Sequence, residues 1–144
     1  KLCPNLKLPS ELNKWYVPSL HQSLKGEWDF NLDWKPKSYP WVRLSFIRAI
    51  FEAQKEIHHG VSLNVPILVM HSDRSTHPKK WHLDAQSSDI VLDVKHIAHY
   101  AQKIQGDVTL CDIKKGLHDL VLSEKSVREQ VYRQLFAWLQ QKGV

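Results

Sequence analysis

Several features that define familiar classes of protein are scarce or missing in this sequence. Two cysteines, Cys3 and Cys111, are too few for a disulfide framework and predict a reducing compartment, the cytoplasm. No apolar run approaches about 18 residues, so the sequence predicts no transmembrane helix and no stable membrane insertion. The net charge of +5 is scattered and forms no basic stripe with interleaved aromatics, which argues against nucleic acid as a partner. An enzyme or a binding module remains.

Two catalytic signatures are also absent. A nucleophile elbow has the pattern Gly-x-Ser-x-Gly between a strand and a helix. The nearest match, residues 60–64, lacks the second glycine and precedes a predicted strand, so we do not expect the chain alone to carry out covalent serine chemistry. His96 and His99 are spaced to share a helix face, yet no cysteine pair or His-Glu-x-x-His pattern accompanies them. We predict a solvated face there and no metal site.

The first 40 residues are predicted to be irregular, because prolines interrupt any long helix. Residues 28–34 alternate apolar with polar side chains, which predicts an extended segment with one aromatic face. That face either lines a pocket for an apolar acyl group or packs an irregular cap on a sheet edge. The N-terminus does not have the pattern of a signal peptide, and it starts at Lys1 rather than methionine. We therefore expect the chain to begin inside a longer protein.

The second half of the sequence predicts a strand, a helix and another strand. Residues 65–71 form a short, β-branched apolar run, as in a parallel strand buried on both faces. Residues 94–104 have helical apolar spacing, with Asp93 as the N-cap and Gly106 at the end. Residues 108–113 form the second strand. Such a unit has parallel strands and a right-handed crossover, which predicts an α/β fold.

Two more predicted helices flank this unit. Residues 41–58 carry apolar side chains on one face, and Ser123 can cap a last helix with a similar face. The first face comprises Leu44, Ile47, Phe51 and Ile57; the second comprises Val127, Val131, Leu135 and Trp138. Two parallel strands cannot cover these helices or satisfy both sheet edges. We therefore expect the C-terminal part of a larger α/β domain, or a domain completed by a partner chain; alone, it should aggregate or dimerise.

The turn after the second predicted strand carries the strongest candidate for chemistry. His118 follows Gly116 there, and loops at the carboxyl ends of strands are where open α/β sheets place their active sites. A histidine suits proton transfer because its unperturbed pKa is about 6.5, although nine histidines are present and any one can simply occupy a polar turn. Its carboxylate partner should follow the first strand, where Asp73, Asp89 and Asp93 are available. Asp93 also suits a helix cap, and Asp73 can close a turn.

Three segments together resemble the C-terminal half of α/β-hydrolase fold proteins, in the branch of serine aminopeptidases and monoacylglycerol lipase- or lysophospholipase-like enzymes. They are the run from Val65 to Ser75, the segment Ser88-Asp-Ile-Val-Leu-Asp93, and the segment from Lys115 to Ser123 that contains Gly-Leu-His. The segment from Gly26 to Pro36 is similar to a cap-to-core connection in bacterial members. The resemblance covers roughly residues 24–143. It implies part of a cap over residues 1–40 and the C-terminal part of the core over residues 41–144.

This resemblance implies a serine hydrolase with the chain order Ser, Asp, His. The histidine falls on His118 and the acid on Asp89, in an Asp-x-Val pattern before the crossover helix. Many members carry the acid nearer the strand, close to where Ser75 stands. Residues 76–88 are therefore a 13-residue insertion, and Asp73 stays the alternative acid.

The resemblance also limits what this chain can contribute. The nucleophile and the oxyanion hole would lie outside the sequence, in the N-terminal half of the fold. No cofactor is implied, and the implied substrates are small acyl esters or lipid-like molecules. The competing interpretation is a truncated or degenerate hydrolase that acts as a non-catalytic binding or assembly module.

Overall fold

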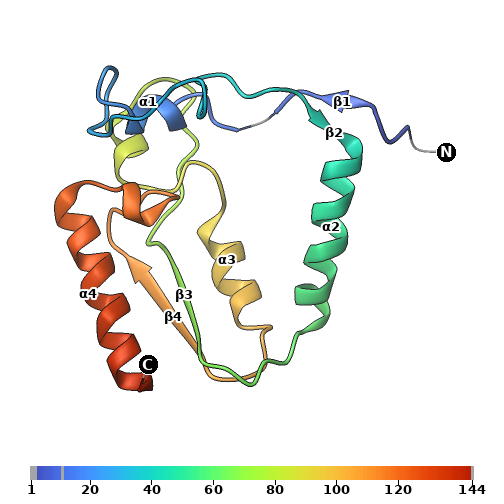
Figure 1. Cartoon of the computed structure of the whole chain (residues 1–144), viewed down its shortest axis with the longest axis vertical. Coiled ribbons are helices and arrows are strands. Elements are labelled where there is room, and N and C mark those ends of the chain that lie inside the picture. The colour runs from blue at the N-terminus through green and yellow to red at the C-terminus, as the bar shows by residue number, and fades with distance from the viewer. Residues whose placement is uncertain (1–2, 11, 144) are drawn as a thin grey trace.

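The computed structural model describes residues 3–10 and 12–143 of the chain. The elements run in the order β1 (Lys7–Leu8), α1 (Tyr16–Leu20), β2 (Val42–Arg43), α2 (Leu44–His59), β3 (Ile67–Ser72), η1 (Leu83–Gln86), α3 (Val94–Ala101), β4 (Val108–Ile113), η2 (Leu120–Leu122) and α4 (Lys125–Lys142). Helix α3 contacts both β3 and β4, and α4 lies along β4 on the other side of the strand pair (Figure 1). The segment around α1 gathers with the loops at the carboxyl ends of β3 and β4.

Strands β3 and β4 pair in parallel, from Ile67 opposite Val108 to Ser72 opposite Ile113. Because α3 connects them, they form the predicted strand–helix–strand unit, and an α/β architecture is confirmed. Within the described residues no third strand joins this sheet. In this part of the chain, the outer edges of β3 and β4 therefore have no strand to pair with.

Helix α3 begins where predicted but ends earlier. The carboxylate of Asp93 accepts a hydrogen bond from the N–H of Lys95, so the predicted N-cap is confirmed. The helix ends at Ala101, before Gly106, so the prediction that this glycine terminates it is wrong. Gly106 has φ +139°, and a Cβ there would lie 2.4 Å from the carbonyl oxygen of Leu63. Glycine is needed because the chain passes another backbone segment there.

Helix α4 buries its predicted face but is capped differently. Val127 and Val131 are buried against β4. The N-cap is Glu124, so the prediction that Ser123 caps this helix is wrong. Ser123 is fully buried, and its hydroxyl accepts a hydrogen bond of 2.9 Å from the N–H of Leu117. A side chain expected to begin α4 therefore fixes the loop before it.

The predicted extended segment over residues 28–34 is present only at its start. Trp28 forms an isolated bridge, and the chain then turns. The side-chain oxygen of Asn31 accepts the N–H of Asp33, and the carbonyl of Asn31 accepts the N–H of Trp34. Asparagine favours such turns because its side chain bonds to the backbone two residues on. The aromatic face is therefore broken, and Trp34 is 87% exposed.

Two clusters of buried side chains form the core. One lies between β4 and α4. The other joins α1 to the loops after β3 and β4 through Tyr16, Leu20, Ala85, Ile90 and Leu117. Helix α2 confirms the helix predicted over residues 41–58, but none of its residues is fully buried. No helix within the described residues is long and apolar enough to cross a bilayer.

Candidate functional site

The loop after β3 closes on itself and returns the chain to the end of the strand. Ser75 and Asp89 form a parallel bridge: the N–H of Thr76 donates to the carbonyl of Asp89, and the N–H of Asp89 donates to the carbonyl of Arg74, both at 3.0 Å. Residues 76–88 are therefore a closed excursion. Asp89 lies beside Ser75 in space despite the separation in sequence.

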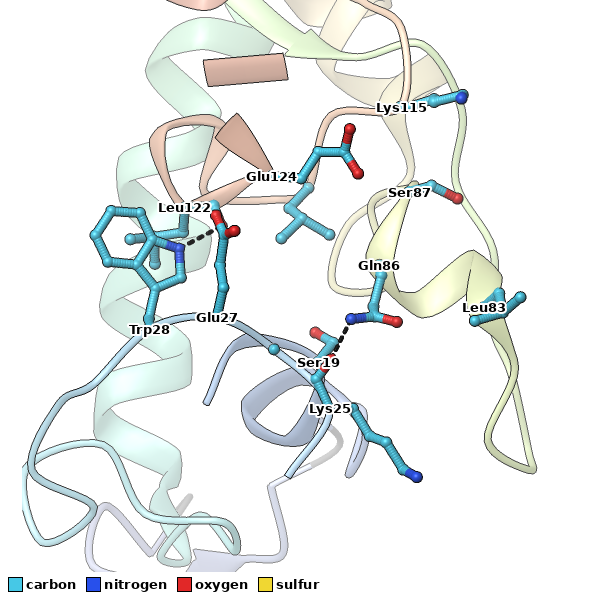
Figure 2. A pocket seen from close by; sticks show the side chains of 12 residues that line it. Ser19, Lys25, Glu27, Trp28, Leu83, Gln86, Ser87, Lys115, Leu122 and Glu124 are labelled. Carbon is cyan, nitrogen blue, oxygen red and sulfur yellow. Dashed lines mark hydrogen bonds between the residues drawn. The ribbon is translucent and has the colours of Figure 1, made fainter. Parts of the chain in front are cut away.

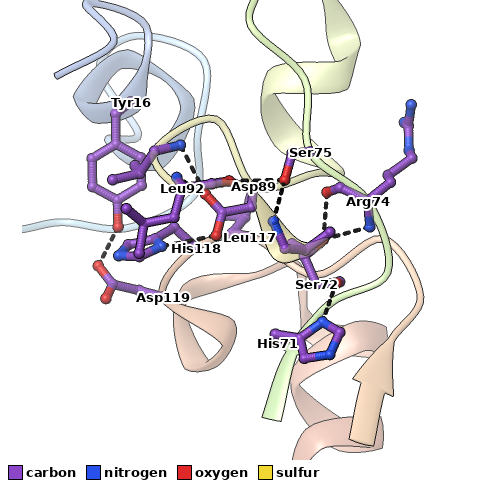
Figure 3. Close-up of polar contacts among 12 residues, drawn as sticks. Tyr16, His71, Ser72, Arg74, Ser75, Asp89, Leu92, Leu117, His118 and Asp119 are labelled. Atoms are coloured by element: carbon purple, nitrogen blue, oxygen red, sulfur yellow. Dashed lines mark hydrogen bonds and ion pairs between the residues drawn. The ribbon is translucent and has the colours of Figure 1, made fainter. Parts of the chain in front are cut away.

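Asp89 is buried and fully engaged. Its residue is only 1% exposed. One carboxylate oxygen, Oδ1, accepts the N–H groups of Val91 and Leu92, each at 2.8 Å. The other, Oδ2, lies 2.9 Å from Nδ1 of His118 (Figure 3). Burial opposes ionisation, but these hydrogen bonds outweigh it and lower the pKa of Asp89.

The turn that carries His118 is fixed at several points. Ser123 holds the N–H of Leu117, as described above. Lys115 has a φ of 59°, and its N–H donates to the carboxylate of Asp73 at 3.0 Å. A residue other than glycine rarely adopts this left-handed backbone conformation unless contacts such as this hydrogen bond hold it. These bonds determine where the next residues of the turn can lie.

His118 itself is bound at one nitrogen only. Nδ1 faces Asp89, and no described residue hydrogen-bonds to Nε2. The side chain is 28% exposed. The hydrogen bond to Asp89 raises the pKa of His118 against the opposing effect of burial. A neutral imidazole that donates from Nδ1 presents Nε2 as a proton acceptor.

The structure separates the three carboxylates that sequence analysis considered. Asp89 binds His118. Asp73 is exposed and binds the backbone of Lys115 instead, and Asp93 caps α3. Of the three carboxylates, the structure therefore brings only that of Asp89 into contact with His118.

Sequence analysis missed a second polar group beside His118. Tyr16 of α1 donates its phenolic hydrogen to Oδ2 of Asp119, and Nζ of Lys35 lies 3.2 Å from the same oxygen. The ring of Tyr16 meets that of His118 edge to face, with centroids 6.1 Å apart. These three residues, together with His118, line an open cleft of about 690 Å³ whose other walls include Trp34.

A different hollow, of about 520 Å³, lies between residues 19–28 and the loops around η1 and η2 (Figure 2). Its wall carries charges of both signs, from Lys25, Glu27, Lys115 and Glu124. The indole N–H of Trp28 donates to the carbonyl of Leu122 at 2.7 Å, and the amide of Gln86 donates to the carbonyl of Lys25. Neither His118 nor Asp89 lines this hollow. Its hydrogen bonds fasten the N-terminal segment to the loops that carry the candidate site.

The histidine pair of α3 lies in an aromatic cluster. The rings of His96 and His99 each meet that of Tyr100 edge to face, and His58 of α2 stacks on it at 4.2 Å. No group of three potential metal ligands occurs among residues 3–10 and 12–143. The two thiols are free: Cys3 is exposed, and Cys111 is half-buried in β4.

Comparison with family models, with curated proteins and with solved structures finds no match to this chain.

Proposed function

We propose that this chain supplies the general base and the acid of a serine hydrolase with the α/β-hydrolase fold, acting on small acyl esters or lipid-like substrates. One observation carries the proposal: Nδ1 of His118 is bound to the buried carboxylate of Asp89, while Nε2 is without a described partner and the side chain lines an open cleft. A catalytic imidazole needs a carboxylate that fixes its tautomer and stabilises the imidazolium.

The proposed reaction proceeds through an acyl-enzyme. As a serine Oγ bonds to the ester carbonyl carbon, its proton passes to Nε2 of His118. The bond from that carbon to the alcohol oxygen then breaks, and the alcohol leaves with the proton from Nε2. Water repeats both steps on the acyl-enzyme and releases the carboxylic acid. Asp89 keeps its negative charge throughout and stabilises the imidazolium that forms in each half.

The serine and the oxyanion hole are proposed to lie outside residues 1–144, in an N-terminal half of the fold or a partner chain. Support comes from the absence of a Gly-x-Ser-x-Gly pattern and, within the described residues, from the unpaired outer edges of β3 and β4 and the exposed apolar side chains of α2. In this arrangement residues 1–40 form part of a cap over the site. The free thiols favour the cytoplasm as the location.

The test uses the complete reading frame that contains this chain. We expect it to encode Gly-x-Ser-x-Gly upstream of Lys1 and to hydrolyse a short p-nitrophenyl ester. His118→Ala should lower kcat by about 10⁴-fold, because removal of a triad member leaves only the remaining binding and electrostatic effects. His99→Ala on α3 is the matched control and should leave kcat unchanged.

The acid is tested by a paired substitution. Asp89→Asn should lower kcat by about 10⁴-fold through the wrong tautomer of His118, whereas Asp73→Asn should leave kcat nearly unchanged. An intact reading frame without the serine motif, or full activity in His118→Ala, would refute the enzyme and favour a non-catalytic binding module.

A further inference from the structure

A second carboxylate, that of Asp119, follows His118 in the sequence and lines the same cleft. Its oxygen Oδ2 accepts hydrogen bonds from two side chains of the N-terminal segment, the phenol of Tyr16 and the ammonium of Lys35. Burial opposes the ionisation of Asp119, but these two bonds outweigh it and lower the pKa of Asp119. Asp119 is therefore a charged carboxylate already engaged by two donors.

Tyr16 is well placed to act on Asp119 and on His118 together. It is 4% exposed and belongs to the buried cluster that joins α1 to the site loops. Burial, with the neighbouring carboxylate, raises the pKa of Tyr16 far above its ordinary value, so the phenol stays a donor. Its ring also lies edge to face against His118, and Nζ of Lys35 lies 4.8 Å from the centre of that ring.

A free carboxylate at this position would interfere with a general base. It would further stabilise the imidazolium and compete with Asp89 for the ring protons. A base whose pKa is raised too far is protonated at neutral pH and gives up its proton less readily. Holding the charged Asp119 in hydrogen bonds to Tyr16 and Lys35 therefore favours proton transfer at Nε2.

We propose that Tyr16 and Lys35 are positioning residues that hold Asp119 away from the imidazole of His118, so that Asp89 remains its carboxylate partner. The inference rests on the proposed role of His118 as the base. It assigns residues 16–35 a chemical role: they set the charge beside the base as well as covering the cleft.

The groups that face His118 define the expected pH behaviour. Asp89 and Asp119 raise its pKa and Lys35 lowers it, while Tyr16 is neutral. Removing the two donors should release Asp119 and raise the pKa of His118 further. Adding Asp119→Asn should then have a larger effect than it has in the wild type, because only a released carboxylate reaches the ring.

The first measurement is an NMR titration of the His118 ring in the full chain, which needs no nucleophile. We expect Tyr16→Phe combined with Lys35→Met to raise the pKa of His118 by about one unit. Asp119→Asn should lower it more in this double variant than in the wild type. The control combines Tyr132→Phe on α4 with Lys55→Met on α2, which likewise removes a phenol and a lysine paired with a carboxylate. It should leave the pKa of His118 unchanged.

Two results would overturn the proposal. One is an unchanged pKa of His118 in the double variant. The other is an equal effect of Asp119→Asn in both backgrounds, which would mean simple addition of charges rather than release of a carboxylate. Should the double variant fail to fold, Lys35→Met alone must raise the pKa in the same direction, and no change would count against the proposal.

The second measurement is the pH profile of kcat in the complete enzyme. In the double variant, the acidic limb of this profile should move to higher pH with little change in KM. Adding Asp119→Asn should return the limb toward its wild-type position. The two proposals can fail separately. If the complete protein shows no esterase activity, the proposed function is rejected but the NMR result still stands. If the pKa of His118 does not change in the double variant, only the positioning role of Tyr16 and Lys35 is rejected.

Discussion

The loops around His118 and helix α2 differ in how deeply they bury their side chains: the loops bury a charged carboxylate, whereas α2 exposes aromatic side chains. Around His118, Asp89 is 1% exposed, and its carboxylate is bound by the N–H groups of Val91 and Leu92 on its own loop and by His118 on the loop after β4. On α2, aromatic side chains such as Phe46 and Phe51 are about 60% exposed, and Glu52 pairs only with Lys55 on the same helix. The candidate chemistry therefore lies in the more deeply buried of these two regions.

The same substitution, isoleucine to alanine, can be compared in β4 and in α2. Ile113 of β4 is fully buried, and Ile113→Ala should lower the free energy of unfolding by about 3–4 kcal/mol, from lost apolar burial and the cavity left behind. Ile50→Ala on α2, where the side chain is 44% exposed, should change it by less than about 1 kcal/mol. Urea denaturation measures both. Equal losses would mean that α2 is as tightly packed as β4.

A somewhat smaller effect is expected from the two competing carboxylates. Asp89→Ala should cost about 2–3 kcal/mol, because it leaves two backbone N–H groups and His118 without their acceptor. Asp73→Ala removes one exposed bond to Lys115 and should cost less than about 1 kcal/mol. Thermal unfolding monitored by circular dichroism ranks the two. A larger loss of stability in Asp73→Ala than in Asp89→Ala would contradict the conclusion that the buried bonds of Asp89 stabilise the loops.

Two serines near the start of α4 provide the next contrast. Ser123→Ala removes the buried acceptor for Leu117 and should cost about 1–2 kcal/mol. Ser126→Ala is exposed and should change stability by less than about 0.5 kcal/mol. In NMR spectra, the first variant should also move the His118 ring signals, since the turn loses an anchor. If both serines cost the same, Ser123 does not fix the turn.

The smallest contrast concerns pH. Asp89 and Glu52 both have a lowered pKa, so each contributes stability above its ordinary pKa of about 4 and loses it as the pH falls through the folded value. Asp89→Asn should flatten the acidic side of the stability profile even at about 1 M salt, because its bonds are buried. Glu52→Gln should flatten it slightly and only at low salt. Comparable salt sensitivity would contradict the buried character of Asp89.

His118 contributes with the opposite sign. Its pKa is raised in the folded chain, so its bond to Asp89 adds stability below the ordinary pKa of histidine and loses this contribution as the pH rises through the folded value. If His118 is the base we propose, hydrolysis should rise with pH across that value, because Nε2 must be unprotonated to accept a proton.

Local pattern was sufficient to predict strands β3 and β4, the crossover helix and its cap, but not the short strands β1 and β2. Hydrophobic runs and the Asp93 cap depend on neighbours within a few residues, which a sequence displays directly. The rule that loops after adjacent parallel strands meet predicted a carboxylate partner for His118 but left Asp73, Asp89 and Asp93 open, and only the resemblance to α/β-hydrolases selected Asp89. These predictions concern one continuous half of the chain.

The contacts that sequence reasoning missed join distant segments. Tyr16 and Asp119 are 103 residues apart, and Lys35 and Asp119 are 84 apart. No local periodicity marks such a pair. Ser123 was misassigned for a related reason, because a good N-cap residue was also the nearest acceptor for a buried N–H. The exposure of α2 likewise depends on what surrounds it, and its own pattern indicated only that it is amphipathic.

Because Ser75 and Asp89 are bridged, the position of the Asp89 carboxylate does not depend on how many residues lie between them. Because the excursion over residues 76–88 leaves and returns at the same point, residues can be added or removed at its tip without moving the carboxylate. The exposed residues at this tip can therefore vary more freely than the charged pair, whereas Ala85 and Ser88 of the same excursion are fully buried. We expect insertions near Lys79 and Lys80 to be tolerated, while a single added residue between Asp89 and α3 would displace the acid from His118.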